Sequence, residues 1–234
     1  MRRAVVTGAA SGIGAAIFAR LSQEGFETIS WDLANPTPVD VSSTTSVQEA
    51  VGRLTAELDA VVLAAGVSRM AKLVDTTDAD WNFQMNVNAF GVFNCLRALY
   101  PRIKDGGSVV VIDSFGGLRG AAYLSAYCAS KFAVTGLIES AAVEFAERKI
   151  RINGVCPMYV RTPMESREVA WEAELRGITP EEVFNGYERT TPLGRVAEPE
   201  EIAKTVLFLA TDASSYMTGS MLTVSGGAHL GFSV

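Results

Sequence analysis

Residues 7–14 read Thr7-Gly8-Ala9-Ala10-Ser11-Gly12-Ile13-Gly14, and they lie between a predicted strand at 3–7 and a predicted helix at 11–24. Glycines at such a junction allow a tight turn and let a phosphate group approach the backbone, while the helix start supplies N–H donors and a positive dipole. The spacing is G-x-x-x-G-x-G rather than G-x-G-x-x-G. This stretch predicts a dinucleotide site, although a plain strand-to-helix turn also fits it.

Outward from the glycines, short β-rich runs alternate with helical ones along the chain. Long helices are expected from 78 to about 100 and from 121 to 148, and several strand runs are continuously apolar, as in a parallel sheet covered on both faces. We therefore predict one domain over 1–234: a doubly wound α/β domain of the Rossmann type, with a parallel sheet of about seven strands and helices on both faces. The expected strands are 3–7, 27–32, a stub at 39–41, 59–65, 108–114, 150–155 and 221–225.

Composition excludes several classes of function. The 234 residues carry a net charge of −6, so no basic field favours nucleic acid or an anionic membrane, and no apolar run approaches the roughly 18 residues of a membrane span. No Cys-x-x-Cys pair or histidine cluster is present to hold a metal. The only histidine, His229, is interpreted as part of the tail, which leaves a Ser-His-Asp triad little to build on. Three dispersed cysteines favour free thiols in a reducing, cytoplasmic compartment.

Asp32 ends the second predicted strand and follows the glycine-rich stretch. A carboxylate at this point can accept hydrogen bonds from both hydroxyls of an adenosine ribose, and it would repel a 2′-phosphate. No Lys or Arg lies among residues 8–14 or directly follows Asp32, so a 2′-phosphate would lack a partner. The sequence therefore favours NAD(H) over NADP(H), with a solvated loop carboxylate as the alternative reading of Asp32.

Tyr127 and Lys131 lie four residues apart on a predicted helix and therefore on one face of it. A tyrosine hydroxyl has a pKa of about 10 in water, and an adjacent ammonium lowers that pKa by stabilising the phenolate. Such a tyrosine could take a proton from an alcohol, or return one to a ketone, near neutral pH. Ser114, at a strand end, could donate a hydrogen bond to the substrate oxygen. An exposed Tyr–Lys pair and a serine cap are the structural alternatives.

In this order, and along nearly the whole chain, these residues resemble the short-chain dehydrogenase/reductase superfamily. The resemblance implies that Tyr127 is the acid/base, that Ser114 holds the substrate oxygen, and that Lys131 also binds the nicotinamide ribose. The implied catalytic set is completed by Asn88, which precedes a glycine by three positions. The implied cofactor-binding set is Gly8, Ser11, Gly12, Ile13, Gly14, Asp32, Leu33, Asp40, Val41, Ala64, Ala65, Gly66, Tyr127, Lys131, Val160 and Thr162.

Three stretches depart from the family pattern. Leu63-Ala64-Ala65-Gly66 stands where the family has Asn-Asn-Ala-Gly, and Pro157-Met158 stands where it has Pro-Gly. The link from Asp32 to Asp40 is too short for the helix usually found there. These departures affect the cofactor and substrate sites and leave the reaction type unchanged.

The resemblance places a substrate lid over 163–190, whose glutamates we interpret as a solvated face. Arg69 or Arg119 could pair with a substrate carboxylate, although surface arginines fit both positions. The run 64–70 and the short link after Asp32 are similar to dihydrodiol dehydrogenases. The expected substrate-binding residues are Arg69, Met70, Phe115, Arg119, Met158 and Tyr159.

The sequence thus predicts an NAD(H)-dependent oxidoreductase that interconverts a secondary alcohol and a ketone on a small polar or cyclic substrate. A dihydrodiol and a hydroxy acid are the candidate substrates. We expect no metal and no nucleic-acid or membrane partner, and a homodimer or homotetramer formed through the helices near 78–100 and 121–148. The alternative is a non-catalytic NAD(H)-binding regulatory protein of the same fold.

Overall fold

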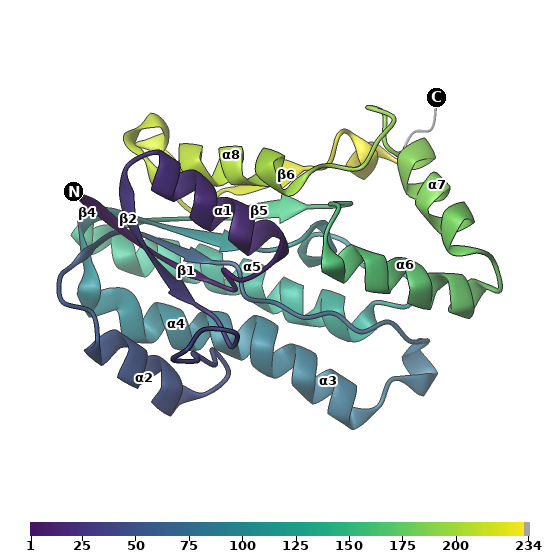
Figure 1. The fold of residues 1–234 in the computed structure, drawn as a ribbon, viewed down its shortest axis with the longest axis horizontal. Helices are drawn as coiled ribbons and strands as arrows, with labels where there is room; N and C mark the ends of the chain where they lie inside the picture. Colours follow the sequence, from purple (N-terminus) through teal and green to yellow (C-terminus); the bar gives the residue numbers. More distant parts are fainter. Residues whose placement is uncertain (232–234) are drawn as a thin grey trace.

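A computed structural model describes residues 1–231 and shows a parallel sheet with helices on both of its faces (Figure 1). The strand order is β2-β1-β3-β4-β5-β6, and every neighbouring pair is parallel. Because the order reverses between β1 and β3, their carboxyl ends flank the crevice in which doubly wound sheets bind ligands. The strands are β1 (Arg2–Thr7), β2 (Phe26–Trp31), β3 (Leu58–Leu63), β4 (Ile103–Ile112), β5 (Arg151–Pro157) and β6 (Met221–Val224).

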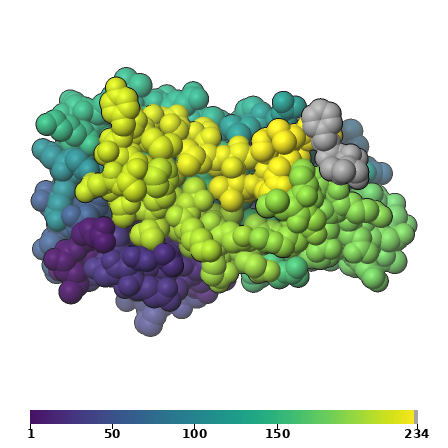
Figure 2. All heavy atoms as spheres, turned by 90° about the horizontal axis from the view of Figure 1, so that it is seen from above, coloured from purple at the N-terminus to yellow at the C-terminus, as the bar shows by residue number. Residues whose placement is uncertain are grey.

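Each face of the sheet has its own apolar core, because successive side chains of a strand point to opposite faces. Val5, Val61 and Val109 pack beneath α2, α4 and α5 on one face. Val6 and Val62 pack beneath α1 and α8 on the other face, which Figure 2 views from outside. These helices are α1 (Gly12–Gln23), α2 (Thr44–Gly52), α4 (Gly91–Leu99), α5 (Ser125–Phe145) and α8 (Pro199–Ala210).

The long helix expected from residue 78 to about 100 is present in three consecutive parts. These are α3 (Asp78–Gln84), a π-helical stretch (Met85–Phe90) and α4. Its N-cap is Thr77, whose hydroxyl oxygen accepts a hydrogen bond from the amide of Asp80. The π-helical stretch contains Asn88, and single π turns inside helices often occur at functional sites.

The boundaries differ from the sequence prediction at three points. Six strands form in the described part of the chain, because 39–41 pairs with no strand and Asp40 instead accepts hydrogen bonds from the amide and hydroxyl of Ser42. The helix expected from 121 begins at Ser125, since Tyr123 has a φ of +66° that no α-helix can contain. β4 begins at Ile103 rather than at 108. The predicted absence of a helix between Asp32 and Asp40 is confirmed.

Residues 163–190 form two helices, α6 (Pro163–Arg176) and α7 (Pro180–Thr190), at one end of the molecule (Figure 2). They share a small core of their own, made of Val169, Ala173 and Val183. The Thr162 hydroxyl caps α6 by accepting a hydrogen bond from the Glu165 amide at 3.1 Å. No helix in the described part of the chain, these two included, is long and apolar enough to cross a membrane.

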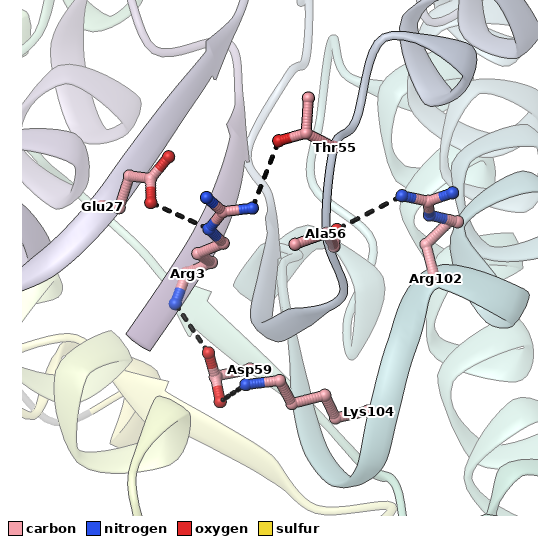
Figure 3. Close-up of polar contacts among 7 residues, drawn as sticks. All are labelled: Arg3, Glu27, Thr55, Ala56, Asp59, Arg102 and Lys104. Atoms are coloured by element: carbon pink, nitrogen blue, oxygen red, sulfur yellow. Dashed lines mark hydrogen bonds and ion pairs between the residues drawn. The ribbon is translucent and has the colours of Figure 1, made fainter. Parts of the chain in front are cut away.

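Charged side chains join four strands at the amino-terminal end of the sheet (Figure 3). The backbone amide of Arg3 donates to Asp59 at 2.6 Å, and Lys104 donates to the same carboxylate at 2.7 Å. The Arg3 guanidinium also donates to Glu27 at 2.8 Å. β1, β2, β3 and β4 are therefore tied together at the end opposite to their carboxyl ends.

Candidate active site

A cavity of about 810 Å³ opens where the parallel strands end. All residues of the predicted cofactor-binding set line it, together with Ser114. Two predicted site residues do not line it: Asn88, which is fully buried behind it, and Arg69. The sheet thus gathers residues from both halves of the sequence around one cavity.

The glycine-rich stretch forms a tightly packed cradle at one end of this cavity. A Cβ on Gly14 would lie 2.0 Å from the carbonyl oxygen of Gly8, so this close approach requires a glycine. Gly8 has a φ of +67°, and a Cβ there would lie 2.8 Å from the Cα of Ala65. The Thr7 hydroxyl accepts the amides of Ala64 and Ala65 at 3.0 and 3.1 Å, which fixes the ends of β1 and β3 side by side.

Asp32 lies half-buried beside this cradle, at the end of β2. Its carboxylate accepts hydrogen bonds from the amide of Ala10 at 3.0 Å and from the amide of Ala34 at 2.9 Å. No Lys or Arg is present among the lining residues at this end, which come from 8–14, 31–33 and 39–41. The end of the cavity near Asp32 is therefore acidic.

Ser114, Tyr127 and Lys131 meet at the other end of the cavity. A Cβ built on Gly116 would lie 3.3 Å from the Ser114 hydroxyl oxygen and 3.3 Å from a ring carbon of Tyr127, so the two side chains converge on one point. The Ser114 hydroxyl oxygen accepts the amide of Gly116 at 3.0 Å. The Lys131 ammonium donates to the carbonyl of Ile112 at 2.9 Å and lies 5.9 Å from the centre of the Tyr127 ring.

Asn88 is held from three sides by hydrogen bonds. Its Oδ1 accepts the amide of Val67 at 2.8 Å, and its Nδ2 donates to the Val67 carbonyl and to the Ser130 hydroxyl, both at 2.9 Å. A Cβ on Gly66 would lie 3.4 Å from Asn88 Oδ1 and 3.9 Å from Lys131 Nζ, so both side chains face that glycine. The π-helical stretch therefore places Asn88 at the same glycine as Lys131.

Burial dominates the protonation of this end of the cavity. It raises the pKa of Tyr127, the negative charge of Glu168 raises that pKa further, and a hydrogen bond with Ser114 lowers it. Burial lowers the pKa of Lys131, while the carboxylate of Asp113 raises it. The expected lowering of the Tyr127 pKa by Lys131 is therefore not the dominant effect in this geometry, because burial and Glu168 act in the opposite direction.

Of the predicted substrate-binding residues, Met70, Phe115, Arg119, Met158 and Tyr159 line the cavity that Tyr127 also lines. Arg69 does not, which corrects the expectation for this residue. Its guanidinium lies 5.3 Å from the ring centres of both Phe83 and Trp171, beside a separate cavity of about 300 Å³. Arg69 therefore packs against these two rings rather than lining the cavity of Tyr127.

Comparison with known proteins agrees with this geometry. A family model described as enoyl-(acyl carrier protein) reductase matches residues 8–229. The oxidoreductase UcpA of Salmonella typhimurium is 34% identical over 256 residues, which covers 100% of this chain and 96% of that protein. The chain belongs to the short-chain dehydrogenase/reductase superfamily.

Two further relatives of this short-chain dehydrogenase/reductase indicate the breadth of the family. The 3-oxoacyl-[acyl-carrier-protein] reductase FabG of Thermotoga maritima is 34% identical over 248 residues, with 95% of this chain and 96% of that protein covered. A crystal structure of an actinorhodin polyketide ketoreductase variant with NADPH superposes with a TM-score of 0.91 at 27% identity, with 97% of each chain covered. The protein is therefore an oxidoreductase of a superfamily that binds nicotinamide cofactors.

The residues of this short-chain dehydrogenase/reductase fit such a cofactor. The glycine cradle leaves no room for a Cβ at Gly14, and it ends at the N-terminus of α1, where unpaired amides favour a pyrophosphate. The Asp32 carboxylate would be available to accept hydrogen bonds from ribose hydroxyls. Gly8, Gly12, Ser11 and Ile13 would hold the pyrophosphate side, and Asp40, Val41, Ala65 and Gly66 would line the adenosine side.

Sequence reasoning missed the acidic side of this short-chain dehydrogenase/reductase cavity. The sequence predicts a solvated face for the glutamates of 163–190, but Glu165, Glu168 and Glu172 line the cavity, and Glu165 is only 6% exposed. Glu174 and Glu181 are exposed and agree with the expectation. The spacing i, i+3, i+7 within α6 is the signal that could have found this face.

His229 is not part of a free tail. Its Nδ1 is hydrogen-bonded to the Ser225 hydroxyl at 2.6 Å, and its ring lies edge-on to Phe115 with 6.1 Å between ring centres. Phe115 lines the cavity, so the C-terminal segment of this short-chain dehydrogenase/reductase supports the substrate end from behind. Local sequence patterns do not reveal this packing, because Phe115 and His229 are 114 positions apart.

Proposed function

We propose that this protein is an NAD(H)-dependent oxidoreductase that interconverts a secondary alcohol and a ketone on a small polar or cyclic substrate. The observation that carries the proposal is the convergence of Ser114 and Tyr127 on one point of the cavity, with Lys131 and Asn88 behind them. The names of FabG and of the polyketide ketoreductase both describe reduction of an oxo group, which supports the same chemistry here.

The side chains divide the work of proton transfer. Ser114 donates a hydrogen bond to the substrate oxygen and so orients it toward Tyr127. The Tyr127 hydroxyl takes the proton of an alcohol or returns one to a ketone. Lys131 is held by the Ile112 carbonyl, and Asn88 positions the turn at Val67 beside it. NAD, when bound, exchanges the hydride with the substrate carbon.

NAD rather than NADP is proposed because of the charges at the adenosine end. Asp32 would accept the ribose hydroxyls, and a 2′-phosphate would face its carboxylate with no Lys or Arg among the lining residues at that end. The ketoreductase relative was solved with NADPH, so the lack of Lys and Arg around Asp32 is the feature of this chain that supports NAD instead.

Two further features complete the proposal. We take 163–190 as a lid, since α6 and α7 line the cavity and have a core of their own. We take α4 and α5 as the surface of a homodimer or homotetramer, because Phe93 and Phe132 are 39% and 49% exposed there. The buried free thiols, Cys95, Cys128 and Cys156, support a reducing, cytoplasmic setting.

Replacement of Tyr127 tests the chemistry. Purified protein is expected to oxidise at least one member of a panel of secondary alcohols with NAD, and Tyr127→Phe to abolish that activity, because the hydroxyl that exchanges the proton is gone. Tyr123→Phe, on the same cavity wall, is the control that keeps activity. Turnover that survives in Tyr127→Phe would refute the mechanism.

Replacement of Asp32 tests the cofactor. Asp32→Ala removes the carboxylate that disfavours a 2′-phosphate, so the ratio of kcat/KM with NAD to kcat/KM with NADP is expected to fall by about tenfold or more. An unchanged ratio would show that Asp32 does not select the cofactor.

A further inference from the structure

One side of the substrate end is a row of carboxylates. Glu165, Glu168 and Glu172 occupy one face of α6 and line the cavity that contains Tyr127. Glu174, on the same helix, is exposed and lies outside the cavity. α6 therefore turns a defined acidic face toward the place where the substrate would react.

Not all oxygens of these carboxylates have a hydrogen-bond partner within the protein. Glu172 accepts hydrogen bonds from Arg176 at 2.6 Å and from the Tyr187 hydroxyl at 2.7 Å. Glu165 is 6% exposed, and its Oε1 is buried without a hydrogen-bond partner. A buried carboxylate oxygen without a partner costs free energy, so this wall has unused capacity to accept a hydrogen bond.

Glu168 lies between these two residues along the helix and faces Ser68. Ser68 is 4% exposed, and its hydroxyl makes no hydrogen bond in the structure, although it is near enough to Glu168 to lower the pKa of that carboxyl, which burial raises. Among the charged groups, Glu168 has the largest effect on the pKa of Tyr127. Because Glu168 also lines the cavity together with Tyr127, it is the carboxylate best placed to act on a substrate there.

The basic residues of the cavity do not cancel this charge. Arg119, Arg167 and Arg176 line it as well, but all three are exposed, and Arg176 is paired with Glu172. The ammonium of Lys131 is buried, but it already donates to the Ile112 carbonyl and is offset by the carboxylate of Asp113. Water screens exposed guanidiniums strongly and screens half-buried or buried carboxylates much less. A substrate carboxylate beside Glu168 would therefore be repelled, and a hydroxyl or an ammonium there would be stabilised.

We propose that Glu168, backed by Glu165, binds a hydrogen-bond donor that the substrate carries next to its reacting carbon, a second hydroxyl or an ammonium. The preferred substrates are then vicinal diols or vicinal amino alcohols, and hydroxy acids with the carboxylate at that position are disfavoured. This assignment rests on the proposed function, because it specifies which secondary alcohols the Ser114–Tyr127 site accepts.

A matched set of cyclic substrates tests the proposal. Cyclohexanol, 1,2-cyclohexanediol, 2-aminocyclohexanol and 2-hydroxycyclohexanecarboxylate differ only in the group next to the carbinol. We expect kcat/KM for the diol or the amino alcohol to exceed that for cyclohexanol by about tenfold or more, the effect of one hydrogen bond to a charged group. Glu168→Ala is expected to remove that ratio, and Glu174→Gln, on the exposed side of α6, to leave it unchanged.

A second variant distinguishes the two donors. Glu168→Gln keeps an acceptor oxygen but loses the charge, so it retains part of a preference for the diol and loses a preference for the amino alcohol. Calorimetric titration of the Tyr127→Phe protein, loaded with NAD, with the same compounds gives the comparison without turnover.

The outcomes separate this proposal from the function on which it rests. Oxidation of cyclohexanol at the same kcat/KM as the donor-bearing substrates, or a donor preference that survives in Glu168→Ala, overturns the role of Glu168 and leaves the proposed function intact. No oxidation of any secondary alcohol, the diol and the amino alcohol included, overturns the proposed function itself.

Discussion

Gly14→Ala is the substitution for which the structure predicts the largest local effect. The new methyl group would lie 2.0 Å from the carbonyl oxygen of Gly8, a full ångström inside the 3.0 Å below which Cβ contacts are essentially never found. The carbonyl carbon of Gly8, at 2.7 Å, would also have to move. Both opposing atoms belong to the backbone, and Gly8 is itself packed against Ala65, so the strand-to-helix turn must shift as a whole.

Such overpacking costs about 1–3 kcal/mol, and we expect the upper part of that range because no flexible side chain can yield. If the turn widens, the cost falls on the phosphate cradle, and about 3 kcal/mol corresponds to a Kd for NADH roughly 150-fold weaker. The assay is a titration of NADH fluorescence, accompanied by thermal unfolding of the free protein.

Gly52→Ala is the matched control. Gly52 is the last residue of α2, is exposed, and a Cβ there would meet nothing within 4 Å. Replacing such a glycine by alanine stabilises a protein by about 0.4–1 kcal/mol, so this variant gains stability and keeps its affinity for NADH. A Gly14→Ala protein that binds NADH with the wild-type Kd would refute the rigid cradle described above.

Three further predictions concern other parts of the molecule. Burial raises the pKa of Asp59, but hydrogen bonds from Lys104 and a backbone amide outweigh it and hold the pKa below its ordinary value. Asp59→Asn should therefore lower the free energy of unfolding, measured in urea, by about 1–2 kcal/mol at about pH 7 and by much less at about pH 3. Gly117→Ala would place a Cβ 2.8 Å from both carboxylate oxygens of Asp113 and should lower the melting temperature and kcat together; an unchanged melting temperature contradicts it. Burial raises the pKa of Glu165 to about 7, so the folded protein loses stability as the pH rises toward that value and the side chain ionises. In Glu165→Gln the melting temperature should therefore change less between about pH 5 and about pH 8 than it does in the wild-type protein. An equal change in the two proteins would count against this burial.

Local chemistry explains why much of the site was predictable from sequence. The glycine-rich turn, Asp32 and the Tyr127–Lys131 pair each depend on spacing within one element or at one strand end, and strand ends of a parallel sheet meet at one edge. The prediction of a strand at 39–41 was wrong because pairing depends on a neighbouring strand, which local sequence does not show. Val39 and Val41 are apolar and buried, but burial alone does not provide a partner for backbone hydrogen bonds.

Properties set by neighbours far apart in sequence were not predictable. Arg69 packs against the rings of Phe83 and Trp171, which come from two different helices, and does not line the cavity. The pKa of Tyr127 depends on burial and on Glu168, a residue 41 positions later in the chain. The many glutamates of 163–190 predict a solvated surface, because the sequence alone does not show which face of α6 lines the cavity.

The small separate core of α6 and α7 has a consequence for how this protein can change. Val169, Ala173 and Val183 pack with one another rather than with either core of the sheet, whereas Tyr127 and Lys131 share α5 with Val134 and Ile138 of a main core. The helical pair can therefore be exchanged as a unit for the corresponding stretch of a relative. Such a chimera would change the substrate range, and through the loss of Glu168 the pKa of Tyr127, while it kept Ser114, Tyr127 and Lys131 in place. Diversification of specificity and conservation of reaction are, in this architecture, assigned to physically separable pieces of chain.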